Sequence, residues 1–238
     1  MEAVLRPPHQ DQMPVLPSIS EREPFVPFFE MDGRVRDEIT ALVQKLFSSA
    51  QGKHRVVFSG SERGTGSSSI CARAGEILAS QVQGSVCLVD CNLRSPSLHR
   101  QFGVEEGEGM ADLLSHSGSI RQYAHPLSGG NFWLISAGLV RDNWLNGIGS
   151  DRMRSRFEEL RASFDYLLID APPLNTCNDA LVLGGLSDGV VLVLKANASR
   201  RETTRKALHQ LKAANVPALG AVLNQRKFPI PEAIYKWL

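Results

Sequence analysis

Hydrophobic residues along the chain follow two alternating patterns. Short segments that are apolar almost throughout predict strands buried on both faces of a sheet; they cover residues 55–59, 85–90, 131–136, 165–170, 189–194 and 219–224. Around these segments, apolar residues recur every three or four positions, which predicts helices over 34–49, 67–81, 110–124, 151–163, 178–186 and 199–214. Strands that alternate with helices predict an α/β fold with a mostly parallel sheet and helices on both faces.

The first predicted helix, whose apolar stripe begins at Val35, separates a tail from a folded domain. Six prolines between Pro7 and Pro27 interrupt any helix or strand ahead of it. We therefore expect a flexible Pro-rich tail over 1–30 and a single domain over 31–238, a length that suffices for one core.

Composition excludes several classes of protein. The 26 Lys and Arg balance 25 Asp and Glu, so we expect no nucleic-acid partner. Neither an apolar run of about 18 residues nor a basic segment followed by an apolar one is present, which predicts a cytoplasmic location. The four cysteines lack paired spacing and neighbouring histidines, which predicts buried free thiols and no structural metal; they are Cys71, Cys87, Cys91 and Cys177.

The segment SGSERGTGSSS at 59–69 lies between a predicted strand and a predicted helix, the context of a phosphate-binding P-loop. The pattern G/A/S-x-x-x-x-G-K-S/T fits, except that Ser67 takes the place of the lysine. In such a loop glycines let backbone N–H groups converge on phosphate, and the last hydroxyl binds Mg²⁺. The candidate nucleotide-binding residues are Ser61, Arg63, Gly64, Thr65, Gly66, Ser67, Ser68 and Ser69.

Loss of the lysine removes a charge-assisted contact worth about 1.5–3 kcal/mol in binding, and more in a transition state. Two arginines lie close to it in sequence. Arg63, inside the loop, is the candidate to replace the lysine, whereas we expect Arg73, two turns into the helix, to be a solvated surface residue.

Two further segments follow the P-loop in order, CLVDCNLRSPSLHRQFG at 87–103 and FDYLLIDAPPLNTCNDALVL at 164–183, and GAVLNQR comes after them at 220–226. Together they resemble the cytoplasmic domain of the bacterial tyrosine kinases of capsule and exopolysaccharide export, the BY-kinases, within the MinD/ParA-type P-loop ATPases. The resemblance covers about residues 35–227 and implies a P-loop NTPase-like fold.

The resemblance also implies roles for single residues. Asp90 matches an acid that helps to hold the metal and prepares the attacking hydroxyl, and Asp170 matches the Walker B acid. Ser68, Asp90 and Asp170 would then hold Mg²⁺ beside ATP or ADP. Asn224 matches an asparagine that reads adenine.

Several positions depart from the family pattern. Asn92 stands where a second acid is usual, and an amide brings neither a base nor a negative charge. Ala41 and Gln44 replace two arginines of a helix through which the kinases form rings. Tyr235 stands alone where the kinases carry a tyrosine cluster.

These departures favour a degenerate BY-kinase-like protein, a cytosolic regulator or scaffold in exopolysaccharide biosynthesis and export with weak or absent nucleotide binding. The resemblance implies a membrane-embedded polysaccharide co-polymerase or chain-length protein as its partner at the inner face of the membrane, and leaves self-association open. One alternative is an active ATPase or tyrosine kinase with a non-standard P-loop. The other is a positioning protein of the MinD/ParA type, although position 62 holds Glu where that branch has a lysine.

Overall fold

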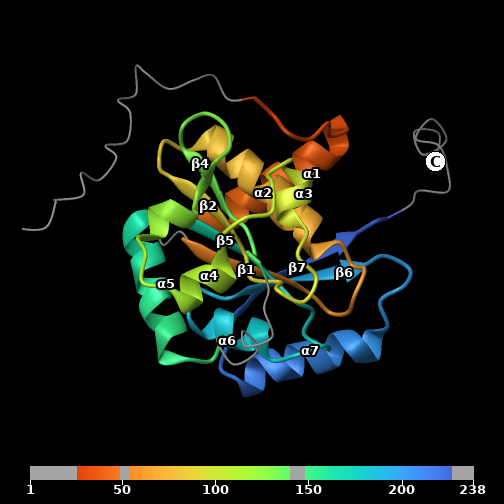
Figure 1. The fold of residues 1–238 in the computed structure, drawn as a ribbon. Helices are drawn as coiled ribbons and strands as arrows, with labels where there is room; N and C mark the ends of the chain where they lie inside the picture. The colour runs from red at the N-terminus through yellow and green to blue at the C-terminus, as the bar shows by residue number, and fades with distance from the viewer. Residues whose placement is uncertain (1–25, 49–53, 140–147, 227–238) are drawn as a thin grey trace, which may run out of the picture.

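The computed structural model describes residues 26–48, 54–139 and 148–226 (Figure 1). The strands are β1 (Arg55–Gly60), β2 (Val86–Asp90), β3 (His125–Pro126), β4 (Phe132–Ile135), β5 (Tyr166–Ala171), β6 (Val190–Lys195) and β7 (Ala218–Asn224). The helices are α1 (Gly33–Phe47), α2 (Ser67–Gln81), α3 (Leu98–Gln101), α4 (Met110–Ser115), α5 (Asp151–Ser163), α6 (Asp179–Gly185) and α7 (Arg201–Ala213), with one 3₁₀ helix over Ile120–Tyr123.

The strands form one sheet in the order β3-β4-β2-β5-β1-β6-β7. All neighbours pair in parallel except β3 and β4, which are antiparallel. Helices α1, α2 and α3 lie on one face of the sheet, and α4, α5, α6 and α7 lie on the other (Figure 1). The prediction of an α/β fold with a mostly parallel sheet and helices on both faces is confirmed.

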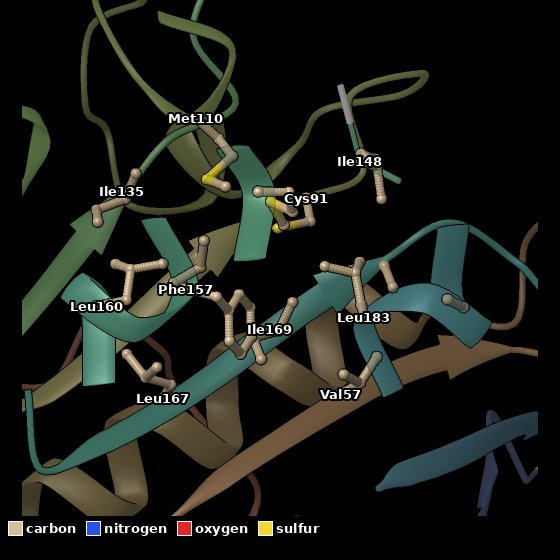
Figure 2. Close-up of a cluster of buried hydrophobic side chains, with 14 of the residues drawn as sticks. Val57, Cys91, Met110, Ile135, Ile148, Phe157, Leu160, Leu167, Ile169 and Leu183 are labelled. Carbon is tan, nitrogen blue, oxygen red and sulfur yellow. The ribbon is translucent and has the colours of Figure 1, made fainter. Parts of the chain in front are cut away.

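Each face of the sheet has its own hydrophobic core, because successive side chains of a strand point to opposite sides. In β1, Val57 packs toward α4–α7, while Val56 and Phe58 pack toward α1 and α2. Figure 2 shows the first of these cores, where Phe157 of α5 lies beside Ile169 of β5. Because the central strands are packed on both faces, their register is fixed, and their carboxyl ends lie together at one edge of the sheet.

Most predicted elements agree with the structure, and the largest error concerns the helix expected over 110–124. Helix α4 ends at Ser115, and a 3₁₀ turn follows only at Ile120. The guanidinium of Arg156 accounts for the break, since it donates to the backbone carbonyls of His116 and Gly118 at 2.6 and 2.8 Å. The prediction for α1 was also wrong at Val35, which is 43% exposed.

Residues 26–30 lie against the domain although they belong to the predicted tail. Phe28 and Phe29 meet the ring of Phe102 edge-on, with centroids 5.0 and 5.2 Å apart. Their backbone N–H groups donate to the buried carboxylate of Glu76 in α2. The guanidinium of Arg73 lies 5.2 Å from the ring centroid of Phe29, so the prediction that Arg73 is a solvated residue was wrong. The rest of the tail, over 1–25, lies outside the described residues.

Three of the four cysteines, Cys71, Cys87 and Cys91, are buried free thiols, and Cys177 is a half-buried one. Burial raises the pKa of each thiol, which keeps the sulfur protonated at neutral pH. No helix within the part of the chain that the structure describes has the length and apolarity needed to cross a membrane.

Candidate functional site

The predicted P-loop connects the end of β1 at Gly60 to the start of α2 at Ser67. Gly64 and Gly66 have φ of 79° and 81°, the left-handed region that glycine adopts without strain. Gly60 is needed for another reason, since a Cβ there would lie 2.3 Å from Oγ1 of Thr65. The loop thus has the tight backbone of a phosphate cradle, with the N-terminus of a fifteen-residue helix behind it.

Two adjacent amide side chains from the end of β7 contact this loop. The Nδ2 of Asn224 donates to the backbone carbonyl of Thr65 at 2.8 Å, and the Nε2 of Gln225 donates to that of Gly64 at 3.4 Å. The Oδ1 of Asn224 accepts from the backbone N–H of Gln225 at 2.8 Å. Asn224 therefore lies at the cradle, where its amide holds the loop backbone; its part in reading adenine stays a prediction.

Two serine hydroxyls fix the other side of the loop. Ser59 donates to the carbonyl of Pro172, in the turn that follows β5, at 2.8 Å. The buried Ser61 lies 3.5 Å, oxygen to oxygen, from Ser199, which lies in the turn between β6 and α7. The loop is thereby held to both strands that flank β1.

The two predicted acids are neighbours in the sheet. Asp90 ends β2 and pairs in register with Asp170 of β5, so their Cα atoms lie about 4.8 Å apart, the spacing of adjacent strands. Ser68, in the first turn of α2, donates its hydroxyl to Oδ2 of Asp170 at 2.5 Å. Both carboxyl groups are fully buried. The structure therefore brings Ser68, Asp90 and Asp170 together beside the cradle.

Burial of this pair disfavours the ionised state. Desolvation raises the pKa of Asp170 well above its ordinary value, the charge of Asp90 raises it further, and the hydrogen bond from Ser68 opposes the rise. Desolvation also raises the pKa of Asp90, against three backbone hydrogen bonds that lower it. Two carboxylates this close do not both ionise freely unless a cation neutralises them.

The donor set fits Mg²⁺. The Oδ1 of Asp170 is buried and has no hydrogen-bond partner among the described residues, so it is an oxygen ligand without a contact. Carboxylate and hydroxyl oxygens are hard ligands, which Mg²⁺ prefers, and Mg²⁺ usually binds one or two carboxylates together with substrate phosphates. The described residues hold no group of three or more His, Cys, Asp or Glu that would bind a metal alone. Mg²⁺ here would therefore depend on a phosphate ligand as well.

Asp90 is occupied by contacts with its own loop. Its Oδ1 accepts from the backbone N–H of Asn92, and its Oδ2 accepts from those of Ser97 and Leu98, each at 3.1 Å. These bonds fold residues 91–98 back over the strand end and begin α3 at Leu98. The carboxylate thus has a structural role that is independent of any metal.

The site has no built-in cation at the lysine position. Ser67 is 8% exposed at the start of α2, and its short side chain carries no charge. Arg63 is exposed, and Arg73 packs on Phe29 and donates to the carbonyl of Ser69 at 3.2 Å. Ser69 contributes this carbonyl rather than a hydroxyl contact.

Helix α1 is exposed to solvent on the face that holds the positions of the two arginines through which the kinases form rings. Ala41 and Gln44 are both exposed on that face. Ala41 and Gln44 are uncharged, so they do not form the ion pairs that two arginines would form. Tyr235 and the rest of the C-terminal segment lie outside the described residues.

Some residues of the site carried no signal in the sequence. Ser59, Ser199 and Gln225 hold the loop through contacts that reach up to 161 positions along the chain. None of the three is a fixed position of the P-loop pattern, so only the sheet order, which places β1 between β5 and β6 and β7 beside β6, reveals the role of these residues.

Comparison with known proteins links this geometry to one group of enzymes. No protein-family model matches the chain. Tyrosine-protein kinase YwqD of Bacillus subtilis is 29% identical over 164 residues, which cover 69% of this chain and 69% of that protein. Putative tyrosine-protein kinase EpsB of Ralstonia nicotianae is 31% identical over 173 residues, which cover 73% of this chain but only 23% of that protein.

Solved structures show the same fold. The kinase domain of Escherichia coli tyrosine kinase ETK superposes with a TM-score of 0.76 at 20% identity, over 90% of this chain and 88% of that one. A ParA family ATPase from Chlorobium tepidum superposes with a TM-score of 0.59 at 17% identity, over 73% of this chain and 75% of that one. The homologues of this chain are bacterial tyrosine-protein kinases, and its fold is the P-loop fold of BY-kinase domains and their ParA-type relatives.

Proposed function

We propose that this chain is a degenerate BY-kinase-like protein that acts as a cytosolic regulator or scaffold in exopolysaccharide biosynthesis and export, with nucleotide binding that is weak or absent. The observation that carries the proposal is Ser67, a short neutral side chain at the position of the phosphate-bridging lysine in an otherwise well-formed cradle.

The charge balance of the site supports weak binding. Loss of a charge-assisted contact costs about 1.5–3 kcal/mol, which corresponds to roughly a 10- to 150-fold loss of affinity. The phosphates of a nucleotide would also approach two buried carboxyl groups, Asp90 and Asp170, with no lysine to offset them. Arg63 is exposed and would have to fold inward to help.

The remaining residues define what such a site can still do. Backbone N–H groups of the loop would bind phosphate oxygens, and Asn224 and Gln225 keep that backbone in place. Ser68 and Asp170 would hold Mg²⁺, which supplies charge neutralisation when bound. Asn92, in place of a second acid, has no basic oxygen with which to accept the proton of a hydroxyl substrate.

The role in a pathway rests on the relatives. Alignments that cover about a quarter of EpsB match this chain to one part of a longer protein. We propose that the chain works beside a membrane-embedded polysaccharide co-polymerase or chain-length protein, at the inner face of the membrane. Such a role needs the fold and its surfaces but not turnover.

Titration calorimetry with ATP and ADP, with and without Mg²⁺, tests the proposal on the wild type and on Ser67→Lys. We expect Ser67→Lys to bind Mg·ATP at least about tenfold more tightly than the wild type. Asp170→Ala in the lysine background serves as the control and should remove the magnesium dependence. Micromolar binding by the wild type that Arg63→Ala abolishes would contradict the proposal and favour an active ATPase or kinase with a relocated cation.

A further inference from the structure

Within the described part of the chain, the sheet ends at an edge strand with no neighbour on its outer side. β7 is last in the strand order, and β6 is its only partner among the described residues. The carbonyl of Asn224 accepts from the N–H of Ala196 in the turn after β6 at 2.8 Å, so Asn224 faces β6. Because alternate residues of a strand direct their N–H and C=O groups to opposite sides, Ala221 and Leu223 direct theirs away from the sheet.

Within the described residues this edge has little of the usual protection, apart from one register shift in its pairing with β6 at Val190–Val191. Edge strands commonly carry a lysine, a proline or a covering element that prevents pairing with other chains. The seven residues of β7, ALGAVLN, contain neither a charge nor a proline. Leu223 is 57% exposed. Unpaired backbone groups beside exposed apolar side chains are what an added strand requires.

An apolar hollow lies where β7 begins. It has a volume of about 290 Å³ and includes Leu208 and Leu211 of α7, Val216 and Pro217, and Ala218 of β7. Leu208 is 43% exposed. Two polar residues, Lys212 and Asn215, also line the hollow. A strand added along β7 would pass this hollow and could place one apolar side chain in it.

The helix beside the hollow is strongly basic. Arg201, Arg205, Lys206 and Lys212 are exposed on α7, against the single acid Glu202. None of these four cations forms an ion pair within the described part of the chain. The helix therefore carries +3 (four cations less one acid), in a chain whose total formal charge is only +1.

We propose that β7 and α7 form a docking surface for an extended, acidic segment of a partner protein, which adds a strand to β7 and inserts an apolar side chain into the hollow. A second copy of this chain fits poorly, because pairing two β7 edges would bring two basic α7 helices together. Nucleic acid would match the charge but not the apolar hollow or the free backbone groups. The proposal is independent of nucleotide binding.

Selection from a random dodecapeptide library against the immobilised full chain tests the surface. We expect the enriched peptides to be acidic and to contain an apolar residue. In fluorescence anisotropy with synthetic copies, Arg205→Glu/Lys212→Glu should weaken binding at least about tenfold. The matched charge change Arg152→Glu/Arg154→Glu on α5, where both arginines are exposed, should leave it unchanged.

Hydrogen exchange of the full chain locates the contact. The amides of Ala221 and Leu223 should exchange fast in the free protein and slowly with peptide bound, and Ala221→Pro should abolish binding while keeping the bonds to β6. Enrichment of peptides without acids, or equal binding to the charge-reversed protein, would overturn the proposal. Slow exchange in the free chain would also overturn it, since the edge would then be covered by this chain or by a second copy, which sedimentation would distinguish.

Discussion

Replacing Asp170 with asparagine should stabilise the fold at neutral and alkaline pH. The wild-type carboxyl group is fully buried, its Oδ1 has no partner among the described residues, and its register neighbour Asp90 is a second acid. Asparagine keeps an oxygen that accepts the hydroxyl of Ser68 and removes the charge. The substitution therefore relieves desolvation and like-charge repulsion together.

The size and the sign of the effect follow from this geometry. Asparagine still leaves one buried polar atom without a partner, so the gain comes from removal of the charge alone, and we expect about 1–3 kcal/mol for Asp170→Asn at pH values where Asp170 is ionised. The folded protein holds the proton of Asp170 more tightly than the unfolded chain, because the pKa is raised on folding. Wild-type stability therefore falls as pH rises from the ordinary Asp pKa, about 3.9, through the raised pKa. The advantage of asparagine should grow across that window and vanish below it.

Urea unfolding from about pH 4 to pH 9 with EDTA present measures this difference. Asp188→Asn is the matched control, and we expect it to change the free energy of unfolding in the opposite direction. Asp188 accepts from the backbone N–H groups of His54 and Arg55 and from the Arg55 guanidinium, and these contacts outweigh desolvation and lower its pKa. The contribution of Asp188 to the free energy of unfolding is present above the ordinary Asp pKa and is lost as pH falls through the lowered pKa. Asp188→Asn should therefore lower the free energy of unfolding at neutral pH by about 0.5–1 kcal/mol, once solvent screening is allowed for. A pH-independent loss of stability in Asp170→Asn would refute the reasoning.

Other substitutions test the cradle and its supports by thermal melting. Gly66→Ala should destabilise by about 1–3 kcal/mol, because φ is 81° and a Cβ would lie 2.4 Å from the Asn224 amide, whereas Gly107→Ala, with open space around it, should be near neutral. Asn224→Ala should cost about 0.5–1.5 kcal/mol and make the P-loop amides exchange faster; unchanged exchange would contradict its role as a clamp. Arg156→Met should cost about 3 kcal/mol or more because three backbone carbonyls lose their donor, while the exposed Arg152→Met should change stability little.

The parts of the fold that sequence predicts well are those set by local pattern. Helices α2 and α5 begin and end where the periodic spacing of apolar residues predicted, at Ser67–Gln81 and Asp151–Ser163. Asp90 and Asp170 could be placed together because each lies at the end of a predicted buried strand, and the carboxyl ends of parallel strands meet at one edge. Each of these inferences uses only the residues that neighbour the element or the acid in the sequence.

The errors arise where distant residues decide the local structure. Helix α4 stops early because Arg156, about forty positions away, takes up its backbone carbonyls. Arg73 is not solvated because the segment that carries Phe29 folds back onto α2. Periodicity carries no information on such contacts, since both partners look like ordinary surface residues in their own segments.

The retained acids show why a partly preserved motif is weak support for catalysis. Asp90 holds three backbone N–H groups of its own loop, and Asp170 accepts the hydroxyl of Ser68, so both carboxyl groups have structural contacts that do not need a nucleotide. A scaffold that abandoned phosphoryl transfer would still lose loop structure if the three contacts of Asp90 disappeared. The lysine that Ser67 replaces has its role in binding phosphate, so a protein that no longer binds phosphate has no need of it. On the scaffold function that we propose, Ser67, rather than the two acids, is therefore the position that distinguishes this chain from a working kinase with the same fold.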